Sequence, residues 1–120
     1  MYLGGFVTYT NEVKIDQLGV SPATIEAHTE VSAETACEMA VGARKKLGAD
    51  VGVSTTGYAG PTGGTEENPV GTVYVAVATG EGVTAHRLYY PRKSRDYVRE
   101  AAASRVMLEV VRAVLTLDKH

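Results

Sequence analysis

The sequence is organised around a glycine-rich stretch that reads Gly57-Tyr-Ala-Gly-Pro-Thr-Gly-Gly64 and closes with Pro69-Val-Gly-Thr72. Apolar, β-branched runs flank it, so it predicts a loop that joins two strands. Glycines let the backbone of such a loop approach a ligand closely, while prolines limit its freedom. Its bare N–H groups would suit an anionic or amide-bearing ligand, although a plain long turn explains the composition equally well. The stretch is neither a P-loop nor a dinucleotide-binding turn.

Strand patterns border the loop on both sides. Asp50–Thr56 precedes it, and two further apolar runs follow it, Val70–Thr79 and Val83–Tyr90. Gly80-Glu81-Gly82 separates these two runs and favours a tight turn, so we expect an antiparallel hairpin. Another strand is expected over Gly5–Thr10, which is rich in β-branched and aromatic residues.

Helices are predicted from capping residues and apolar spacing. Ser32 caps a helix through Leu47 with Gly48 just beyond, and two short helices are expected over Glu12–Leu18 and from Ser21 through His28. Ser94 caps a last helix running to about residue 117. Its apolar stripe, of the kind that faces a core, consists of Tyr97, Ala101, Leu108, Val111 and Leu115. The order of these elements predicts a single α/β domain over residues 1–120, with three α/β/α layers and a mixed sheet.

Composition narrows the class of protein. The 120 residues are 44% hydrophobic and 22% charged, with a formal charge of −2 and no block of like charges, which argues against general affinity for nucleic acid or an anionic membrane. Cys37 is the one cysteine, so no intramolecular disulfide forms, and we interpret it as a small buried hydrophobe. His28, His86 and His120 fall in different elements, which does not favour a metal site. We expect a cytoplasmic protein without a membrane span.

Two motifs resemble those of the CinA C-terminal domain family. Gly57–Val73 is similar to the family's signature loop, and Gly5-Phe-Val-Thr-Tyr-Thr-Asn-Glu-Val-Lys14 is similar to its second strand and the following turn. The resemblance extends over essentially the whole chain. It implies a nicotinamide-nucleotide amidase, which hydrolyses nicotinamide mononucleotide to nicotinate mononucleotide and ammonia with a serine nucleophile and a nearby lysine and tyrosine. No metal or cofactor is implied.

The resemblance also assigns residues. It places the family's lysine at Lys14 and its tyrosine at Tyr9. In the first turn of a helix capped by Asn11, the helix dipole would disfavour the ammonium form of Lys14 and favour a neutral amine that accepts a serine proton. Arg95 and Arg99 would grip a phosphate, or would simply be solvated helix charges. The predicted substrate-binding residues are Thr56, Gly57, Ala59, Gly60, Pro61, Gly63, Gly64, Arg95 and Arg99.

The family's nucleophile has no counterpart in these 120 residues. In the family a Glu-Ser-Cys-Thr-Gly-Gly segment precedes the position of Met1, so we expect a domain truncated at its N-terminus. Ser21, Ser32 and Ser94 are expected as helix caps and Ser104 in mid-helix, and Ser54, inside a strand near the loop, is the least implausible substitute.

Two functions therefore stay open. The chain is either part of an amidohydrolase acting on a pyridine nucleotide, or a non-catalytic module for nucleotide binding or assembly. A third possibility is a fragment that folds only through self-association. We expect a homo-oligomer under each of these, because loss of a strand and a helix exposes a sheet edge and an apolar face. Tyr89 and Tyr90 would offer a ring for stacking on nicotinamide, although strand alternation turns one of them to the core.

Overall fold

The computed structural model describes residues 3–4, 20–29 and 31–117. The predicted strand over 5–10 and the helix over 12–18 lie outside the described residues, as do Tyr9 and Lys14. The described elements follow the predicted order and confirm the α/β class. They are β1 (Leu3–Gly4), α2 (Pro22–His28), α3 (Ala33–Leu47), β2 (Val51–Gly57), β3 (Thr72–Thr79), β4 (Gly82–Tyr89) and α4 (Arg95–Leu117).

Capping residues explain where the two long helices begin. Ser32 Oγ accepts a hydrogen bond from the N–H of Thr35 at 3.1 Å, and Ser94 Oγ accepts one from the N–H of Tyr97 at 3.1 Å. α3 ends at Gly48, whose φ of 62° lies in the left-handed region that favours glycine. Both predicted caps and the predicted stop are therefore confirmed.

The sheet has the strand order β1-β2-β3-β4. β1 pairs with β2 in parallel, whereas β2 with β3 and β3 with β4 are antiparallel, so the predicted mixed sheet and the hairpin are confirmed. The hairpin closes where Thr79 pairs with Gly82. β4 lies at an edge of this sheet.

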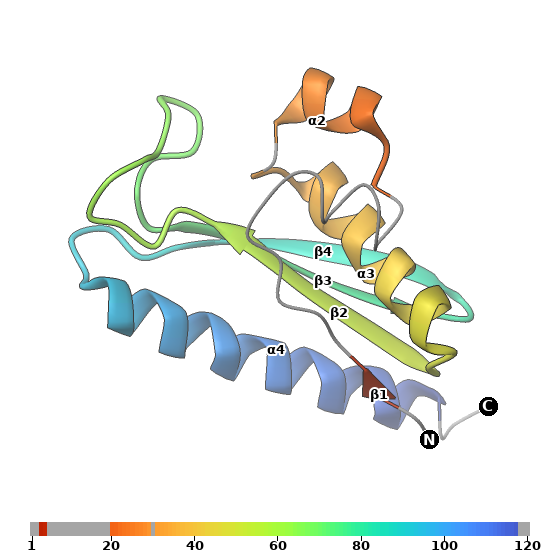
Figure 1. Ribbon diagram of the computed structural model, residues 1–120. Coiled ribbons are helices and arrows are strands. Elements are labelled where there is room, and N and C mark those ends of the chain that lie inside the picture. The colour runs from red at the N-terminus through yellow and green to blue at the C-terminus, as the bar shows by residue number, and fades with distance from the viewer. Residues whose placement is uncertain (1–2, 5–19, 30, 118–120) are drawn as a thin grey trace.

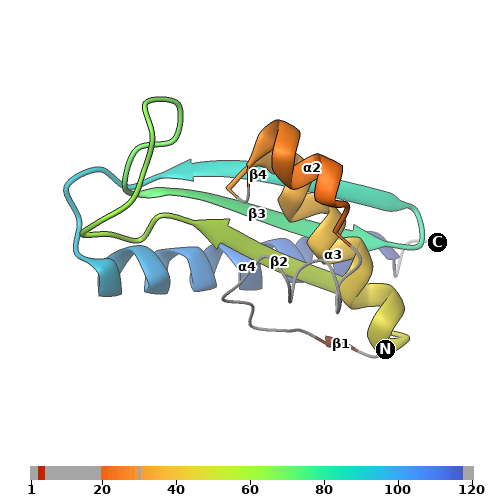
Figure 2. The ribbon, with the colours of Figure 1, turned by 45° about the horizontal axis from the view of Figure 1, so that its top comes forward.

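Helices cover the two faces of the sheet, with α2 and α3 on one side and α4 on the other (Figures 1 and 2). Side chains along β3 point alternately to the two faces of the sheet. Val73 and Val75 pack with Val98 of α4, and Ala76 packs with Ala40 of α3. Small residues bring α3 close to the sheet, since a Cβ on Gly52 would collide with the backbone of α3. Within the described ranges, the helices fall short of the length and apolarity that a membrane span requires.

The apolar stripe predicted on α4 faces away from the sheet, which corrects the prediction that it faces the core. Val98 and Ala102 form the buried side of α4, and the carboxylate of Glu109 is buried on the same side. The predicted stripe is exposed: Tyr97 is 47%, Leu108 44%, Val111 50% and Leu115 56% exposed. Spacing misled the prediction because apolar residues lie on two sides of α4, and the side toward the sheet also carries the charged Glu109.

Candidate functional site

Backbone hydrogen bonds close the neck of the glycine loop. Tyr58 N–H donates to Thr72 O at 2.9 Å, and Gly71 N–H donates to Tyr58 O at 2.7 Å. Tyr90 N–H, at the end of the neighbouring strand, donates to Gly71 O at 2.9 Å. The loop therefore begins and ends at fixed points on the sheet. β1 runs parallel to β2, so both strands point toward the end of the sheet that carries the loop.

The glycines of the loop meet conformational needs. Gly60, Gly63, Gly64 and Gly71 have φ values of 93°, 94°, 88° and 100°, which residues with a Cβ rarely adopt. A Cβ on Gly57 would collide with the backbone of Thr72. The glycine content alone is thus explained by the shape of the loop, and evidence for a ligand must come from the groups around it.

Asn68 fixes the far side of the loop. Its Nδ2 donates to Val31 O at 3.1 Å, just before α3, and its Oδ1 accepts from the hydroxyl of Tyr74 in β3 at 2.8 Å. Thr65 Oγ1 accepts from the N–H of Asn68 at 3.0 Å, so this residue also shapes the loop locally. Sequence analysis missed this role, because an asparagine in a glycine-rich turn is ordinary.

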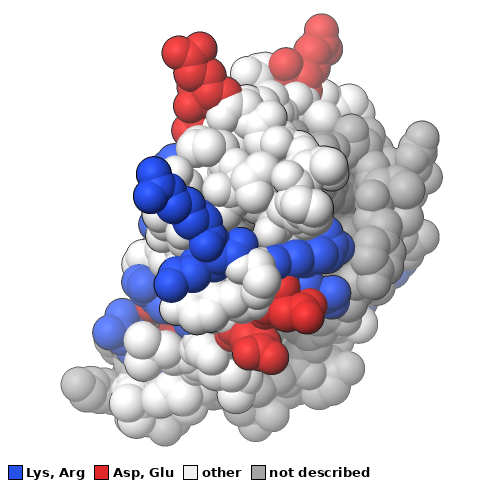
Figure 3. Space-filling view, turned by 90° about the vertical axis from the view of Figure 1, so that its left-hand side faces the viewer, with Lys and Arg blue, Asp and Glu red and all other residues white. Residues whose placement is uncertain are grey.

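Arg95 joins the loop to the start of α4. Its Nη1 donates to Gly60 O at 3.2 Å, and Gly60 itself is buried. Arg99 is exposed one turn further along the helix. Figure 3 shows lysine and arginine side chains gathered on this end of the molecule, with acidic side chains above and below them. The structure thus brings together two of the predicted site segments, the loop and the start of α4.

Thr72 carries a buried hydroxyl at the base of the loop. The residue is fully buried, and its Oγ1 has no hydrogen-bond partner among the described residues. Because Val73 packs toward α4, strand alternation turns Thr72 to the α3 face, which it shares with Thr56 of β2. A buried hydroxyl without a partner is costly and is uncommon unless it serves a ligand or water. In the sequence, Thr72 is marked only by its place as the last residue of the motif.

The five serines of the chain all lie in described segments. Ser54 Oγ donates to Ala36 O of α3 at 2.6 Å, which fixes its hydroxyl in the packing between β2 and α3. Ser32 and Ser94 cap helices as predicted. Ser21 occupies the N-cap position of α2 without the expected side-chain capping bond, and Ser104 is exposed within α4. None of the five serines is paired, within the described residues, with a group that would activate it as a nucleophile.

Comparison with known proteins gives the family. The family model described as the CinA C-terminal domain matches residues 1–115 of the chain. The chain belongs to the CinA C-terminal domain family. The match confirms the resemblance that the glycine loop indicated, and it covers both the loop and the start of α4.

Curated CinA relatives carry the matching segment in longer chains. A CinA-like protein of Shewanella halifaxensis is 52% identical over 100 residues, which are 83% of this chain and 24% of the relative. A nicotinamide-nucleotide amidohydrolase PncC of Shewanella oneidensis has the same identity and coverage. The chain thus spans about a quarter of the length of these curated relatives.

Solved CinA structures confirm the fold. The competence/damage inducible protein CihA from Agrobacterium tumefaciens is 40% identical with a TM-score of 0.85, over 89% of this chain and 66% of that chain. A competence-damaged protein (CinA) superfamily protein from Escherichia coli is 33% identical with a TM-score of 0.83, over 89% of this chain and 62% of that chain. Roughly a third of each solved chain therefore lies beyond the matched part.

The remaining predicted site residues of this CinA domain fall into two groups. Thr56 is buried, and Ala59 packs against the core beneath α4, so both belong to the support of the loop. Pro61 and Gly63 are exposed at its surface, and Gly64 is half-buried.

Tyr89 and Tyr90, considered for stacking on nicotinamide, differ in burial. Tyr90 packs against the core and against Tyr97, whereas Tyr89 is 46% exposed and lies beneath the guanidinium of Arg87.

Other reactive side chains do not gather into a second centre. No group of three or more His, Cys, Asp or Glu residues in the described segments could hold a metal ion. Cys37 is half-buried, and burial together with the charges of Glu34 and Glu38 raises the pKa of its thiol. Cys37 was expected to be buried, but it is only half-buried, packed against the alanine cluster between α3 and β3.

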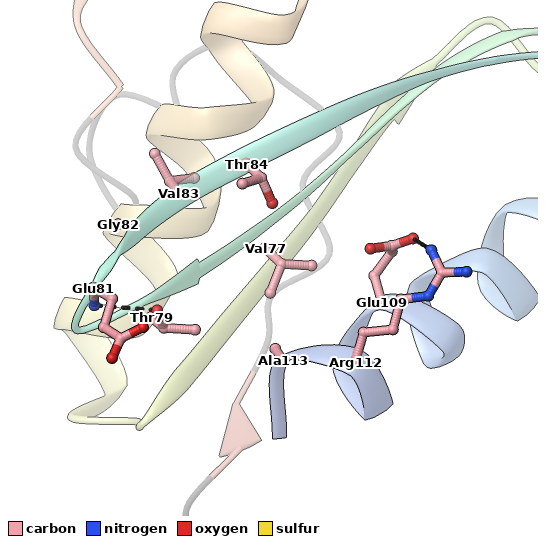
Figure 4. Close-up of a pocket in the computed structure, with 9 residues that line it drawn as sticks. All are labelled: Val77, Thr79, Glu81, Gly82, Val83, Thr84, Glu109, Arg112 and Ala113. Carbon is pink, nitrogen blue, oxygen red and sulfur yellow. Dashed lines mark hydrogen bonds and ion pairs between the residues drawn. The ribbon is translucent and has the colours of Figure 1, made fainter. Parts of the chain in front are cut away.

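One hollow of the surface lies away from the glycine loop. It has a volume of about 370 Å³ and opens near the β3–β4 turn, at the opposite end of the sheet from the loop. Figure 4 shows Val77 and Thr84 extending from the sheet toward Glu109, Arg112 and Ala113 of α4. Since no sequence motif falls there, the candidate site rests on the loop rather than on this hollow.

Proposed function

We propose that the chain carries the nucleotide-binding part of a nicotinamide-nucleotide amidohydrolase, which holds nicotinamide mononucleotide between the glycine loop and the start of α4. The observation that carries the proposal is the hydrogen bond from Arg95 to Gly60 O, because it brings a guanidinium to the backbone of the loop. Arg99, one turn along α4, adds a second cation that suits the phosphate. The name of the Shewanella oneidensis relative, a nicotinamide-nucleotide amidohydrolase, supports this substrate class.

Catalysis in this proposal uses Lys14 and Tyr9. Lys14, as a neutral amine, takes the proton of a serine hydroxyl, which then attacks the carboxamide carbon of nicotinamide. Lys14 then returns this proton to the amide nitrogen, which leaves as ammonia, and water hydrolyses the acyl-enzyme to nicotinate mononucleotide and the free serine. Tyr9 donates a hydrogen bond to the substrate. None of the five serines of the chain has an activating group among the described residues. The nucleophile is therefore assigned to the family's Ser-Cys-Thr-Gly-Gly motif, which these 120 residues do not contain.

The 120-residue chain is thus expected to bind nucleotide without turnover. Calorimetric titration with nicotinamide mononucleotide, beside an ammonia assay, tests this directly. Nicotinamide riboside, which lacks the phosphate, is the matched ligand and should bind at least about tenfold more weakly. Absence of nucleotide binding, or equal binding of the riboside, would overturn the proposal.

A second candidate function is a non-catalytic module for nucleotide binding or assembly, which keeps the glycine loop but does not hydrolyse the nucleotide. The exposed apolar stripe of α4 favours an assembly role, since a surface of this kind marks a contact with another protein chain. Ammonia release by a longer chain that carries the Ser-Cys-Thr-Gly-Gly segment separates the two functions, because only the first requires hydrolysis. A cytoplasmic location, which the single cysteine favours, stays a prediction for either function.

A further inference from the structure

Thr72 lies between two tyrosines at the end of the sheet that carries the glycine loop. On one side Tyr58 donates its N–H to Thr72 O at 2.9 Å, and on the other side Tyr89 of β4 is paired with Thr72 in the antiparallel ladder. Ala59 and Leu88, which are adjacent to these tyrosines in sequence, pack against the core beneath α4. Alternation therefore turns both tyrosine side chains to the α3 face, which Thr72 shares.

The two tyrosines have the spacing that a flat ring needs. Neighbouring strands lie about 4.8 Å apart, so the backbones of Tyr58 and Tyr89, two strands apart, are separated by about 10 Å. Stacked rings need about 3.5–4.0 Å between their atoms, and a planar ligand between two rings therefore needs about 7–8 Å. Tyr58 is half-buried and Tyr89 is 46% exposed, so a ligand meets these rings first and reaches Thr72 as they move apart.

The smaller Thr72 side chain, between the rings, carries a hydroxyl that the chain does not use. Thr72 is fully buried, and its Oγ1 has no hydrogen-bond partner among the described residues. Its backbone is already engaged, because the N–H donates to Pro69 O at 3.0 Å and the O accepts from Tyr58. A hydroxyl both donates and accepts, whereas a buried place without a charged partner disfavours an anion. The ligand group that fits is a neutral one with a donor and an acceptor, such as a carboxamide.

Both rings are supported from within the domain. Gly63 of the loop lies against the Tyr58 ring, because a Cβ at this position would come 3.0 Å from its Cδ1. The guanidinium of Arg87 lies 5.7 Å from the centre of the Tyr89 ring, and its Nη2 donates to Glu67 O at 3.3 Å. The face of a tyrosine ring attracts cations, and a nicotinamide nucleotide carries a positive charge on its pyridine ring. Stacking between the two tyrosines thus suits that ring.

Cations for a phosphate lie on the other side of the loop. Arg95 reaches Gly60 O at 3.2 Å from the start of α4, and Arg99 is exposed one turn further along that helix. Thr72 is on the α3 face instead. A mononucleotide has one anionic end and one aromatic end, so each of the two sets of groups suits one end.

We propose that Thr72 recognises the carboxamide of the nucleotide, while the pyridine ring stacks between Tyr58 and Tyr89. The phosphate then lies at Arg95, on the other side of the loop. The proposal rests on the function proposed above and adds which end of the ligand each side of the loop takes. Thr72 is in this view a specificity-determining residue, which separates nucleotides that carry a carboxamide from other sugar phosphates.

Binding of three ligands to the 120-residue chain tests the proposal. Nicotinamide mononucleotide carries both ends, nicotinamide riboside only the carboxamide end, and ribose 5-phosphate only the phosphate end. Thr72→Val should raise the dissociation constants of the mononucleotide and the riboside several-fold and leave that of ribose 5-phosphate within about twofold. Thr72→Ser, which keeps the hydroxyl, should stay near the wild-type values. Arg95→Ala should give the opposite pattern, with ribose 5-phosphate weakened and the riboside little changed.

Ligand-observed nuclear magnetic resonance, which detects millimolar binding, measures these constants. If Thr72→Val leaves the mononucleotide unchanged, or weakens ribose 5-phosphate as much as the mononucleotide, the proposal fails. It fails as well if the wild-type chain binds ribose 5-phosphate as tightly as the mononucleotide, although the phosphate site then stands. If none of the three ligands binds, the proposed function itself fails.

The stacking part has its own matched pair of substitutions. Tyr89 and Tyr97 are 46% and 47% exposed, but only Tyr89 stands beside Thr72. Tyr89→Leu should raise the dissociation constant of the mononucleotide about threefold or more, and Tyr97→Leu should leave it unchanged. Equal effects of the two substitutions would overturn the placement of the ring.

Discussion

Tyr74 donates its hydroxyl to Asn68 Oδ1 at 2.8 Å, and this bond ties the glycine loop to β3. Asn68 also donates to Val31 O, so one side chain links the loop, the sheet and the segment before α3. The loop is therefore held at its neck by backbone bonds and at its far side by Asn68. A loop fixed at both places presents its N–H groups in one arrangement.

Removing the Tyr74 hydroxyl should loosen the far side of the loop. We expect Tyr74→Phe to lower the free energy of unfolding by about 0.5–1.5 kcal/mol and Asn68→Ala by about 1–3 kcal/mol, since the second change removes both bonds. Urea unfolding measures the loss. Glu67→Ala is the control, because Glu67 is exposed and Arg87 contacts only its backbone oxygen. Equal stability of Asn68→Ala and Glu67→Ala would show that the bonds do not fix the loop.

Replacement of Arg95 should weaken nucleotide binding. Arg95→Ala removes the guanidinium beside Gly60 and should raise the dissociation constant of nicotinamide mononucleotide by about tenfold or more, with little effect on the riboside. Arg95→Lys should recover only part of the loss, because an ammonium lacks the planar fork of donors. Calorimetry measures both constants. An equal loss for nucleotide and riboside would mean that Arg95 supports the loop and does not contact the phosphate.

The hydroxyl of Thr72 should matter for ligand binding more than for folding. Thr72→Val keeps the shape of the side chain and removes a buried hydroxyl, so the free energy of unfolding should stay the same or rise by about 1 kcal/mol. Nucleotide affinity should fall several-fold. Thr79→Val, in the same strand, is expected to destabilise slightly, because Thr79 Oγ1 accepts from the N–H of Glu81. Thermal unfolding with and without nucleotide gives both the stability and the nucleotide affinity of each variant. An unchanged affinity of Thr72→Val would exclude a role of the Thr72 hydroxyl in ligand binding.

Sequence patterns predicted the elements of this fold better than the contacts between them. Ser32, Gly48 and Ser94 act through hydrogen bonds to residues close in sequence, so their roles follow from local chemistry. The side of α4 that faces the sheet depends on Glu109, whose burial is possible only because Arg105, Arg112 and His86 converge on it. A pattern of apolar residues carries no information about that convergence.

The candidate site was likewise predicted only in part from the sequence. The glycine loop and Arg95 were predicted, and the structure places them in contact. Asn68 and Thr72 were missed as site residues, because their roles depend on contacts that the sequence does not show. Asn68 makes two hydrogen bonds across the loop, and Thr72 has a buried hydroxyl without a partner among the described residues. Tyr9 and Lys14 stay predictions, since they lie outside the described residues.

The Glu109 network should make stability depend on pH. Burial raises the pKa of the Glu109 carboxyl, but the hydrogen bond from Arg105 and the charges of His86 and Arg112 outweigh burial and hold that pKa below its usual range. A carboxyl with a lowered pKa stabilises the fold above its unfolded pKa, and the contribution is lost as pH falls through the folded value. Glu109→Gln should therefore lower the free energy of unfolding by roughly 1–3 kcal/mol at neutral pH.

The difference in the free energy of unfolding between Glu109→Gln and the wild-type chain should shrink as the pH is lowered through the acidic range, where the wild-type carboxyl also becomes neutral. Urea unfolding at a series of pH values measures it. Glu100→Gln, at an exposed position of the same helix, is the control and should show little change at any pH. If the difference in the free energy of unfolding between Glu109→Gln and the wild-type chain does not change with pH, the loss of stability comes from packing.

A longer chain that carries the family's Ser-Cys-Thr-Gly-Gly segment before Met1 should release ammonia from nicotinamide mononucleotide. In that chain, replacing the serine of the segment or changing Lys14→Ala should abolish release, since one supplies the nucleophile and the other its base. Lys45→Ala is the matched control, because Lys45 is exposed in the last turn of α3, far from the loop in sequence. Nucleotide binding measured on the same variants separates lost chemistry from lost affinity. If the longer chain binds the nucleotide and releases no ammonia, the amidohydrolase assignment fails and the binding module remains; if Lys14→Ala keeps full activity, another group acts as the base.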